Sequence, residues 1–416
     1  MKQEIRARID QIRQGIVPKG YKKTKTAIVP ADWKESPIGK YIREYTEKTT
    51  IPNQYPVLTS ARTGLMLQTD YYSNRQVTTE DNVGYNVLPY GYITFRSRSD
   101  DGRFRFNENR IIERGIISYF YPVFSFSEEV CHEYMLYLLN FSIYRRMYPY
   151  AEGTAQQVLS LKKLGQFKYS LPLVAEQKKI AEILSTQDKA IELQECKIDE
   201  LKRFKKGCLE RMFPRKGQKV PEKRFPGFTD DWEQRKVSDV AEICTGGTPS
   251  TGIEKYWYPK EIPWLSSGEV HKKYITYTDN KISVEGMNNS SARMIPENSV
   301  LIALAGQGKT RGTVAINRIP LTTNQSIAAM AFSNEVVPEF VFCNLESRYE
   351  EIRRMSSGDG SRGGLNKQII GEMEIPYTSK EEQTKIGAYF FNLDNLITLH
   401  QRKLEEMKKQ KKALMQ

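Results

Sequence analysis

Histidine and cysteine, which build most metal centres and disulfide frameworks, are scarce in this sequence. Among 416 residues there are three histidines and five cysteines. The cysteines lie far apart and form no Cys-x-x-Cys pair: Cys131, Cys196, Cys208, Cys244 and Cys343. We therefore expect reduced thiols in a cytoplasmic protein, and no metal site.

Long apolar runs are also missing. No stretch approaches the roughly 18 apolar residues of a membrane-spanning helix, and Met1–Arg6 lacks the apolar segment of a secretion signal. Acidic residues are in deficit, with 50 Asp and Glu against 63 Lys and Arg, a net charge of +13. These features favour a soluble, intracellular protein with a polyanionic partner.

A catalytic constellation is not apparent either. The three histidines stand in unrelated contexts: His132, His271 and His400. Residues 304–310 resemble a phosphate-binding loop, because they follow an apolar run and end in Gly-Lys-Thr. That loop must open a helix, whereas residues 312–314 are typical of a returning strand. We expect a hairpin with Lys309 and Arg311 at its tip.

What the sequence does contain is nearly the same helix twice. Residues 176–210 align with residues 382–416 at a constant offset of 206, and 12 of the 35 positions are identical. Such self-similarity marks a duplicated unit, and a period of about 200 residues indicates two copies of a domain followed by a helix. A chain built this way has approximate twofold symmetry, which suits a nearly symmetric ligand such as duplex DNA.

Apolar residues in each copy follow a heptad, whose steps of three and four define a coiled-coil seam. The predicted seam residues are Ile180, Leu184, Ile191, Ile198 and Leu201 in the first copy and Ile386, Phe390, Ile397, Leu404 and Met407 in the second. Each helix of roughly 35 residues would be about 50 Å long. Packed antiparallel, the two helices would form a spacer with a globular domain at each end.

The N-terminal residues repeat a fragment of the central helix. Gly15–Pro18 matches Arg211–Pro214. Four isoleucines fall at helical spacing: Ile5, Ile9, Ile12 and Ile16. We predict that residues 1–17 form a short helix beside the C-terminal helix, which would close the repeat circularly.

Between the helices, short apolar runs bounded by Gly, Pro, Asn and Asp indicate strands, with a helical piece late in each half. We predict an α+β protein with two mixed α/β domains, joined by two long antiparallel coiled-coil helices in a pseudo-twofold repeat. The expected boundaries are an N-terminal helical segment 1–20, a first domain 21–170, a central helix 171–213, a basic linker 214–225, a second domain 226–375 and a distal helix 376–416.

Several motifs match a known family. They are Gly246-Gly247-Thr248-Pro249-Ser250, Tyr256-Trp257, Ile262-Pro263-Trp264-Leu265-Ser266-Ser267, Asn324-Gln325, and Glu176-Gln177 repeated as Glu382-Gln383. With these motifs the chain resembles the specificity subunit of type I restriction–modification enzymes over essentially its whole length. The first half has no Gly-Gly-Thr-Pro-Ser counterpart.

The resemblance implies a non-catalytic DNA reader that carries no cofactor. Two target-recognition domains would each contact one half of a bipartite, asymmetric DNA site, and the helices would set the gap, roughly 10–15 base pairs for this length. Two methyltransferase subunits using S-adenosylmethionine would dock, and ATP-driven restriction subunits would complete the assembly.

Candidate DNA contacts are mainly basic side chains, because Arg pairs with guanine and bridges phosphates. They are Arg62, Arg96, Arg98, Arg103 and Arg105 in the first half, and Ser266, Ser267, Lys272, Lys273, Lys309, Arg311 and Arg362 in the second. Two alternatives remain open. One is a nucleotide hydrolase that uses Lys309, and the other is a coiled-coil scaffold that binds only proteins.

Overall fold

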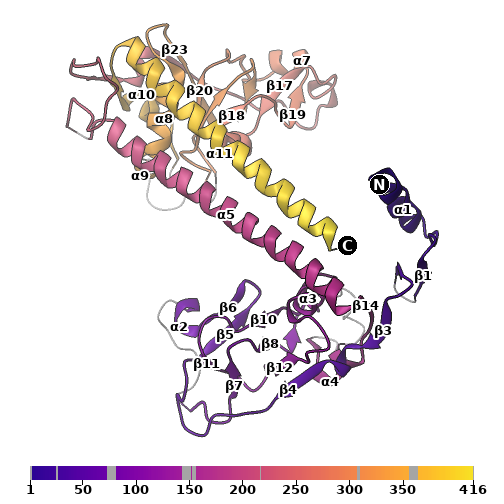
Figure 1. Cartoon of the computed structure of the whole chain (residues 1–416). Helices are drawn as coiled ribbons and strands as arrows, with labels where there is room; N and C mark the ends of the chain where they lie inside the picture. The colour runs from indigo at the N-terminus through magenta and orange to yellow at the C-terminus, as the bar shows by residue number, and fades with distance from the viewer. Residues whose placement is uncertain are drawn as a thin grey trace. The chain divides into compact units, whose positions relative to one another are not determined.

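The structure, a computed structural model, describes residues 2–24, 27–72, 81–142, 151, 156–215, 217–306, 310–355 and 364–415. The chain divides into two compact units, Met1–Glu192 with Glu406–Gln416, and Leu193–Glu405. Each unit combines short strands with helices (Figure 1). This confirms the predicted α+β class.

The first unit is built from small antiparallel sheets. Its largest has the strand order β10-β8-β12-β4, and its core includes Phe95 and Phe106, whose ring centroids lie 4.6 Å apart. The four strands are β4 (Ile42–Tyr45), β8 (Ile93–Phe95), β10 (Phe106–Glu108) and β12 (Val123–Phe126). Paired strands around it are β1 (Tyr21–Lys23) with β2 (Ile28–Pro30), β3 (Lys34–Pro37) with β14 (Lys168–Leu171), β5 (Leu58–Ala61) with β6 (Gly64–Leu67), β7 (Asn86–Pro89) with β11 (Arg114–Ile117), and β9 (Arg98–Ser99) with β13 (Gln157–Val158). Its short α-helices are α2 (Gln68–Tyr71), α3 (His132–Tyr137) and α4 (Leu161–Gln166).

The second unit has a larger, mixed sheet in the order β16-β23-β20-β21-β18, in which β18 is parallel to β21. Its strands are β16 (Ala241–Thr245), β18 (Tyr274–Ile275), β20 (Val300–Ala303), β21 (Val314–Asn317) and β23 (Ile327–Phe332). A smaller sheet contains β19 (Asn280–Ile282), β17 (Ile262–Leu265) and β22 (Thr322–Thr323), and β15 (Glu233–Lys236) pairs with β24 (Glu374–Tyr377). The short helices are α6 (Val237–Val240), α7 (Val284–Asn288), α8 (Pro338–Ser347), α9 (Tyr349–Arg354) and α10 (Lys367–Glu372).

The segment that resembles a phosphate-binding loop lies between two paired strands. Strand β20 pairs antiparallel with β21, with Val300 opposite Ile316. The chain after the loop therefore returns as a strand, as predicted, and does not open the helix that a phosphate-binding loop requires.

Two long helices, α5 (Val174–Met212) and α11 (Lys380–Leu414), bear the internal repeat. In the second unit, Gln194 contacts His400 (Nε2 to Nδ1, 2.8 Å) and Lys205 contacts Asp394 (2.7 Å). In these two contacts the residue number rises along α5 as it falls along α11, so the helices run antiparallel. Gln194 and His400 are also equivalent positions of the repeat, as expected for a pseudo-twofold arrangement.

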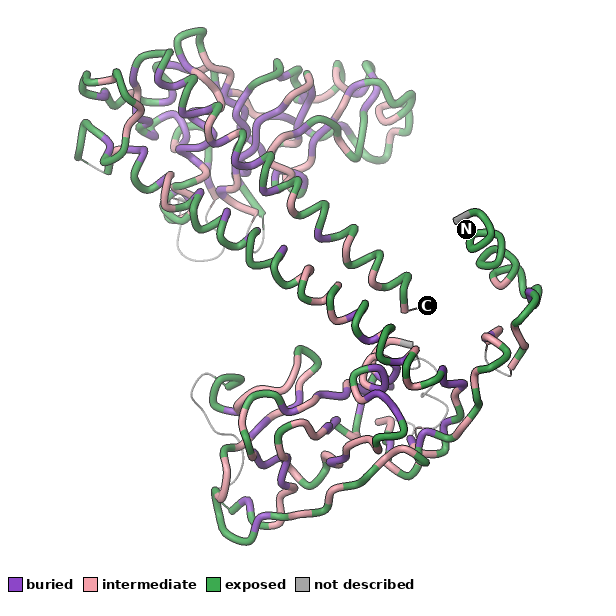
Figure 2. The backbone as a smooth tube through the Cα atoms, in the orientation of Figure 1, coloured by how far each residue is buried: buried purple, intermediate pink, exposed green. Residues whose placement is uncertain are grey.

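Buried positions recur at intervals along both long helices (Figure 2), and most of the ten predicted seam residues are among the buried positions. Seven of the ten are buried: Leu184, Ile198, Leu201, Ile386, Phe390, Ile397 and Leu404. Ile180, Ile191 and Met407 are half-buried. Ile386 and Phe390 belong to the second domain's core cluster. The start of α11 is thus domain core as well as seam.

Helix α1 (Lys2–Arg13) forms where a helical segment was predicted. Its isoleucines are largely exposed, at 49% for Ile5 and 44% for Ile9, and Ile16 beyond the helix is 51% exposed. Contact of this segment with the C-terminal helix stays a prediction. Among the described residues, none of the helices combines the length and apolar character needed to cross a membrane.

Candidate nucleic-acid interface

The repeated Glu-Gln pair anchors each long helix to a domain, and the glutamine makes the same contacts in both units. In the first unit, Gln177 accepts a hydrogen bond from the Cys131 backbone N–H (2.8 Å) and donates to a backbone carbonyl. In the second, Gln383 accepts from the Val337 backbone N–H (2.9 Å) and likewise donates to a carbonyl. Cys131 and Val337 immediately precede α3 and α8. Both long helices are therefore tied to the start of a domain helix in the same way.

The adjacent glutamate binds a tryptophan in both units. The Trp33 indole N–H donates to Glu176 at 3.3 Å, and the Trp232 indole N–H donates to Glu382 at 3.0 Å. Glu382 is fully buried and also accepts two hydrogen bonds from Arg224, at 2.7 and 2.8 Å. The second unit therefore adds a buried ion pair to the shared anchor.

The Gly-Gly-Thr-Pro-Ser motif follows β16 where the backbone approaches other segments closely. A Cβ atom on Gly246 would lie 2.0 Å from the Thr323 carbonyl oxygen, and one on Gly247 would lie 2.6 Å from the Ser291 carbonyl carbon. Real Cβ atoms do not tolerate such distances, so both positions require glycine.

Other predicted motifs converge on the same turn. The Trp264 indole donates to the Gly247 carbonyl (3.0 Å), and the Thr248 hydroxyl donates to the Gln325 side-chain oxygen (2.6 Å). The structure thus brings together three motifs that are far apart in the sequence.

Two predicted contacts after β17 are engaged within the protein. Ser266 and Glu269 form a capping box at the 3-10 helix η6 (Ser267–Lys272). Lys272 binds Glu269 at 2.8 Å and Asp279 at 2.7 Å. Ser267 is half-buried at the start of η6.

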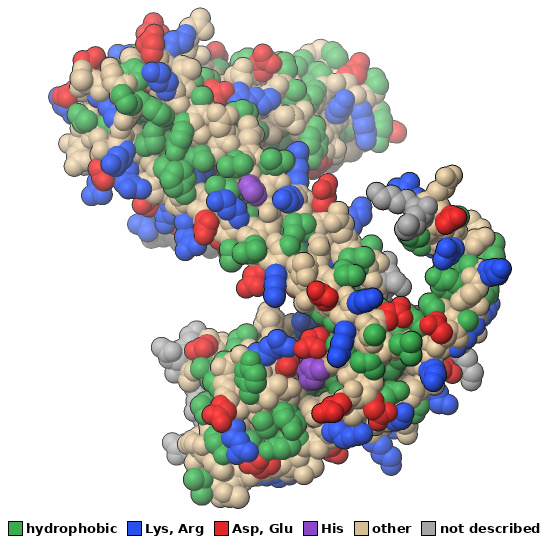
Figure 3. All heavy atoms as spheres, in the orientation of Figure 1, with side chains coloured by type: hydrophobic (Ala, Val, Ile, Leu, Met, Phe, Trp, Pro, Cys, Tyr) green, Lys and Arg blue, Asp and Glu red, His purple; other side chains and the backbone are tan. Residues whose placement is uncertain are grey.

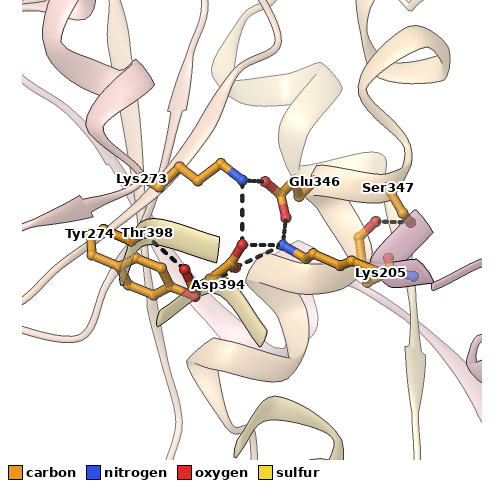
Figure 4. A network of polar contacts seen from close by, with 8 residues as sticks. Lys205, Lys273, Tyr274, Glu346, Ser347, Asp394 and Thr398 are labelled. Atoms are coloured by element: carbon orange, nitrogen blue, oxygen red, sulfur yellow. Dashed lines mark hydrogen bonds and ion pairs between the residues drawn. The ribbon is translucent and has the colours of Figure 1, made fainter. Parts of the chain in front are cut away.

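Lys273, another predicted DNA contact, lies in an ion network that joins the second domain to α5 and α11 (Figure 4). Lys205 contacts both Asp394 oxygens at 2.7 Å and Glu346 at 2.6 Å, while Lys273 pairs with Glu346 and lies 3.6 Å from Asp394. The Tyr274 hydroxyl donates to Asp394 at 3.1 Å. Desolvation opposes ionisation of Glu346, but the two lysines lower the pKa of its carboxyl.

The first unit contains a reduced version of this network. Lys411 binds Asp188, and these residues are the repeat equivalents of Lys205 and Asp394. The Tyr137 hydroxyl donates to Asp188 at 2.7 Å. The Asp188 side chain is 40% exposed, against 8% for Asp394.

Two of the five predicted arginines of the first unit, Arg62 and Arg103, contact Asp101. Arg62, at the turn between β5 and β6, contacts Asp101 at 2.7 Å. Asp101 also accepts hydrogen bonds from the Arg103 backbone N–H and the Ser99 hydroxyl. Although desolvation opposes it, these donors and Arg62 lower the pKa of the Asp101 carboxyl.

Two further arginines lie over aromatic rings. The Arg98 guanidinium is 4.5 Å from the centroid of Phe120, and that of Arg105 is 5.4 Å from Phe141. Burial lowers the pKa of Arg105, whereas Arg96 is exposed. In the second unit Arg311 is half-buried, and Lys309 and Arg362 lie outside the described residues.

The two anchors mark two equivalent blocks, and a family match covers both. The family described as "Type I restriction modification DNA specificity domain" matches residues 32–203 and 229–409, beginning beside Trp33 and Trp232. The chain belongs to this family.

Relatives in the specificity family are similar over part of their length. The type I restriction enzyme MjaIX specificity subunit of Methanocaldococcus jannaschii is 31% identical over 188 residues, which are 44% of this chain and 41% of that protein. The HindI specificity subunit of Haemophilus influenzae is 30% identical over 153 residues, 36% of this chain and 32% of that protein. The matched stretches thus span less than half of these relatives.

A solved structure shares the specificity fold over nearly the whole chain. The type I restriction-modification system S subunit from M. genitalium has a TM-score of 0.58 at 15% identity, covering 96% of this chain and 98% of that one. This likeness confirms the architecture of two domains and two long helices.

The sequence did not single out the acidic and aromatic residues that contact the candidate side chains. Asp101 and Phe120 position the arginines, and Asp188 and Asp394 bind lysines of the partner helix. A signal existed for the second pair only, because both aspartates and both lysines are identical between the two copies.

Proposed function

We propose that this chain is the non-catalytic specificity subunit of a type I restriction–modification complex. It reads a bipartite, asymmetric DNA target with one recognition domain per half-site. The observation that carries this proposal is that the two units share an anchor but differ in the surfaces that could face DNA. Gln177 and Gln383 make the same contacts. The surface with the Arg62–Asp101 pair in the first unit, in contrast, does not resemble the surface around the glycine turn in the second.

The first half-site is read by five arginines, Arg62, Arg96, Arg98, Arg103 and Arg105, of which Arg62 and Arg103 share the partner Asp101. Arg62 and Arg103 are 64% and 70% exposed, so their guanidinium groups can reach base edges or phosphates. Basic and acidic side chains are interspersed over the face drawn in Figure 3, so that face has no continuous basic surface. We therefore assign sequence specificity to these individual arginines and not to the overall charge.

The second half-site is read from the surface around the Gly-Gly-Thr-Pro-Ser turn. We assign direct contacts to Ser267, Lys309, Arg311 and Arg362. Ser266, Lys272 and Lys273 act there as positioning residues, since their polar groups are bound to Glu269 and Glu346 inside the protein.

The long helices set the gap between the half-sites and dock two methyltransferase subunits. Leu193 and Leu399, equivalent in the repeat, are 71% and 64% exposed, and the exposed Lys197 and Lys403 follow each by one turn. Packing does not constrain exposed residues, so their identity in both copies supports one kind of partner bound twice. S-adenosylmethionine and ATP then belong to the partner subunits.

Footprinting of the chain with its methyltransferase partner on genomic DNA fragments tests the proposal. We expect two short protected blocks with a fixed gap, and exchange of one recognition domain for an unrelated one should change one block only. Uniform protection, or none, would contradict DNA reading and favour a protein-only scaffold. ATP turnover lost in Lys309→Ala would favour a nucleotide hydrolase instead.

A further inference from the structure

The end of α5 fills an aromatic box in the second unit. The ring centroid of Phe213 lies 5.2 Å from that of Phe340, 6.1 Å from Trp232 and 6.3 Å from Phe390. Met212 is buried beside it in the same core cluster. These two residues therefore plug the core of the second recognition domain.

The first unit has counterparts of Trp232, Phe340 and Phe390, two of which are aromatic. Trp33 and Trp232 both bind the anchor glutamate. Tyr134 corresponds to Phe340, because each follows by three residues the backbone N–H that the anchor glutamine accepts. Leu184 corresponds to Phe390 by the offset of 206.

These first-unit residues line a cavity. Trp33, Tyr134 and Leu184, together with Ile180, border a space of about 1030 Å³. Basic side chains also line it, namely Lys408, Lys411 and Lys412 of α11 and Arg62, Arg103 and Arg105 of the first domain. The positions that hold Phe213 and Met212 in the second unit thus correspond to open space in the first.

The chain has a segment that matches the plug. Gly15-Ile16-Val17-Pro18 aligns with Arg211-Met212-Phe213-Pro214. Ile16 and Val17 are 51% and 41% exposed, so burying them removes apolar surface from water. The Ala31 backbone N–H donates to the Gly20 carbonyl (3.0 Å) at the base of the β1–β2 hairpin, so Val17 lies three residues from that base and can reach about 10 Å from it. Strand β2 of this hairpin, Ile28–Pro30, itself lines the cavity.

We propose that residues 15–18 fold back into this cavity, where Ile16 and Val17 close the core of the first recognition domain as Met212 and Phe213 close the second. Helix α1 is then held near the end of α11. The occupant is a segment of the same chain, because its sequence matches the plug of the other copy and the hairpin that tethers it lines the cavity.

Disulfide trapping tests this directly in the full chain. Val17→Cys combined with Leu184→Cys should give an intrachain bond under mild oxidation, located by peptide mapping in a background where the exposed Cys196 is Ser. Val17→Cys with Leu193→Cys, an exposed position on the same helix, is the matched control and should give none. No bond in the first pair, or a bond only between two chains, would overturn the proposal.

A second measurement covers the case in which Leu184→Cys does not fold. Ile180→Cys then replaces it, since Ile180 is half-buried at the same cavity. In addition, Ile16→Asp should lower the melting temperature, whereas Gln14→Asp, an exposed polar neighbour, should leave it unchanged. Equal melting temperatures for both variants would contradict burial of Ile16. Neither measurement depends on DNA recognition, so the proposed function can fail separately.

Discussion

The two units share a scaffold but stabilise it unequally. Both use Gln177 or Gln383 to bind a backbone N–H, and these contacts are nearly identical. The ionic contacts differ, because Glu382 is fully buried with Arg224 while Glu176 is half-buried. Both copies therefore keep the hydrogen bond from the glutamine to the backbone, whereas only the second copy adds a buried ion pair at the glutamate.

The largest difference should appear at the anchor glutamates. Glu382→Gln leaves the Arg224 guanidinium without its carboxylate in a site where that side chain is 11% exposed, which we expect to cost about 3–5 kcal/mol. Glu176→Gln leaves an amide oxygen that can still accept from the Trp33 indole, so it only removes the charge from one hydrogen bond and should cost about 1 kcal/mol or less. Hydrogen exchange at the first turns of α11 and α5 measures the two losses separately, since a two-unit chain need not unfold in one step. Equal losses would break the comparison.

The aspartates of the helix pair should differ next. Asp394→Asn weakens contacts to Lys205, Lys273 and Tyr274 and should cost about 3 kcal/mol, because the buried Lys205 then keeps only Glu346 as a carboxylate partner. Asp188→Asn acts on a carboxylate that is 40% exposed, so the expected loss is under about 1 kcal/mol. Denaturant unfolding of both variants measures the two losses in the free energy of unfolding, and we expect the loss for Asp394→Asn to be the larger. A larger loss for Asp188→Asn would mean that exposure does not decide these energies.

The sequence predicts which positions of the long helices are buried, because the apolar residues there follow a periodic pattern. The heptad singled out Leu184, Phe390 and Leu404, which are buried in the structure, because apolar burial repeats along a helix. The Gly246–Ser250 motif was singled out only through the family resemblance, and the structure gives the physical reason for it, since Gly246 stands where no side chain fits.

Charged partners were not readable in this way. Lys273 looks like any exposed lysine in the sequence, but folding places it beside Glu346, a contact between distant segments. Lys205 and Lys411 are equivalent positions of the repeat, but the heptad pattern predicts only apolar contacts and so assigns no contact to a lysine. Only the three-dimensional pairing with Asp394 and Asp188 reveals one.

Acid should expose a further asymmetry, because Glu346 has no acidic equivalent in the first unit, where Asn140 occupies that position. The pKa of Glu346 lies below its ordinary value in the folded protein, so its contribution is present above about pH 4.5 and is lost as pH falls through the folded pKa. Glu346→Gln should therefore cost about 2 kcal/mol at neutral pH, and the gap to wild type should close in acid. Unfolding measured from pH 7 to pH 3 tests this. A gap that stays constant with pH would contradict the assigned charge state.

Whether the two recognition surfaces act independently can be tested with one substitution in each unit, for which we expect a smaller effect than those above. Asp101→Asn frees Arg62 from its carboxylate partner, and we expect roughly tenfold weaker discrimination at the first half-site, about 1.4 kcal/mol. Asp279→Asn is the matched change in the second unit, where Lys272 keeps its bond to Glu269. Footprint titration of each variant should show a loss in one block only. Loss in both blocks from either variant would mean that the domains do not read independently.

The smallest effects are expected where the two copies agree on an exposed surface. Leu193→Ser and Leu399→Ser should each change the free energy of unfolding by less than about 0.5 kcal/mol, because both side chains lie mostly in water. If one kind of partner binds both positions, each variant should weaken one of two binding events by about fivefold, roughly 1 kcal/mol, and the double variant should weaken both. Calorimetric titration with the methyltransferase subunit resolves the two events. Unequal effects of the single variants would show that the asymmetry of the buried anchors extends to the partner-binding surface, and would remove the main support for two equivalent docking sites.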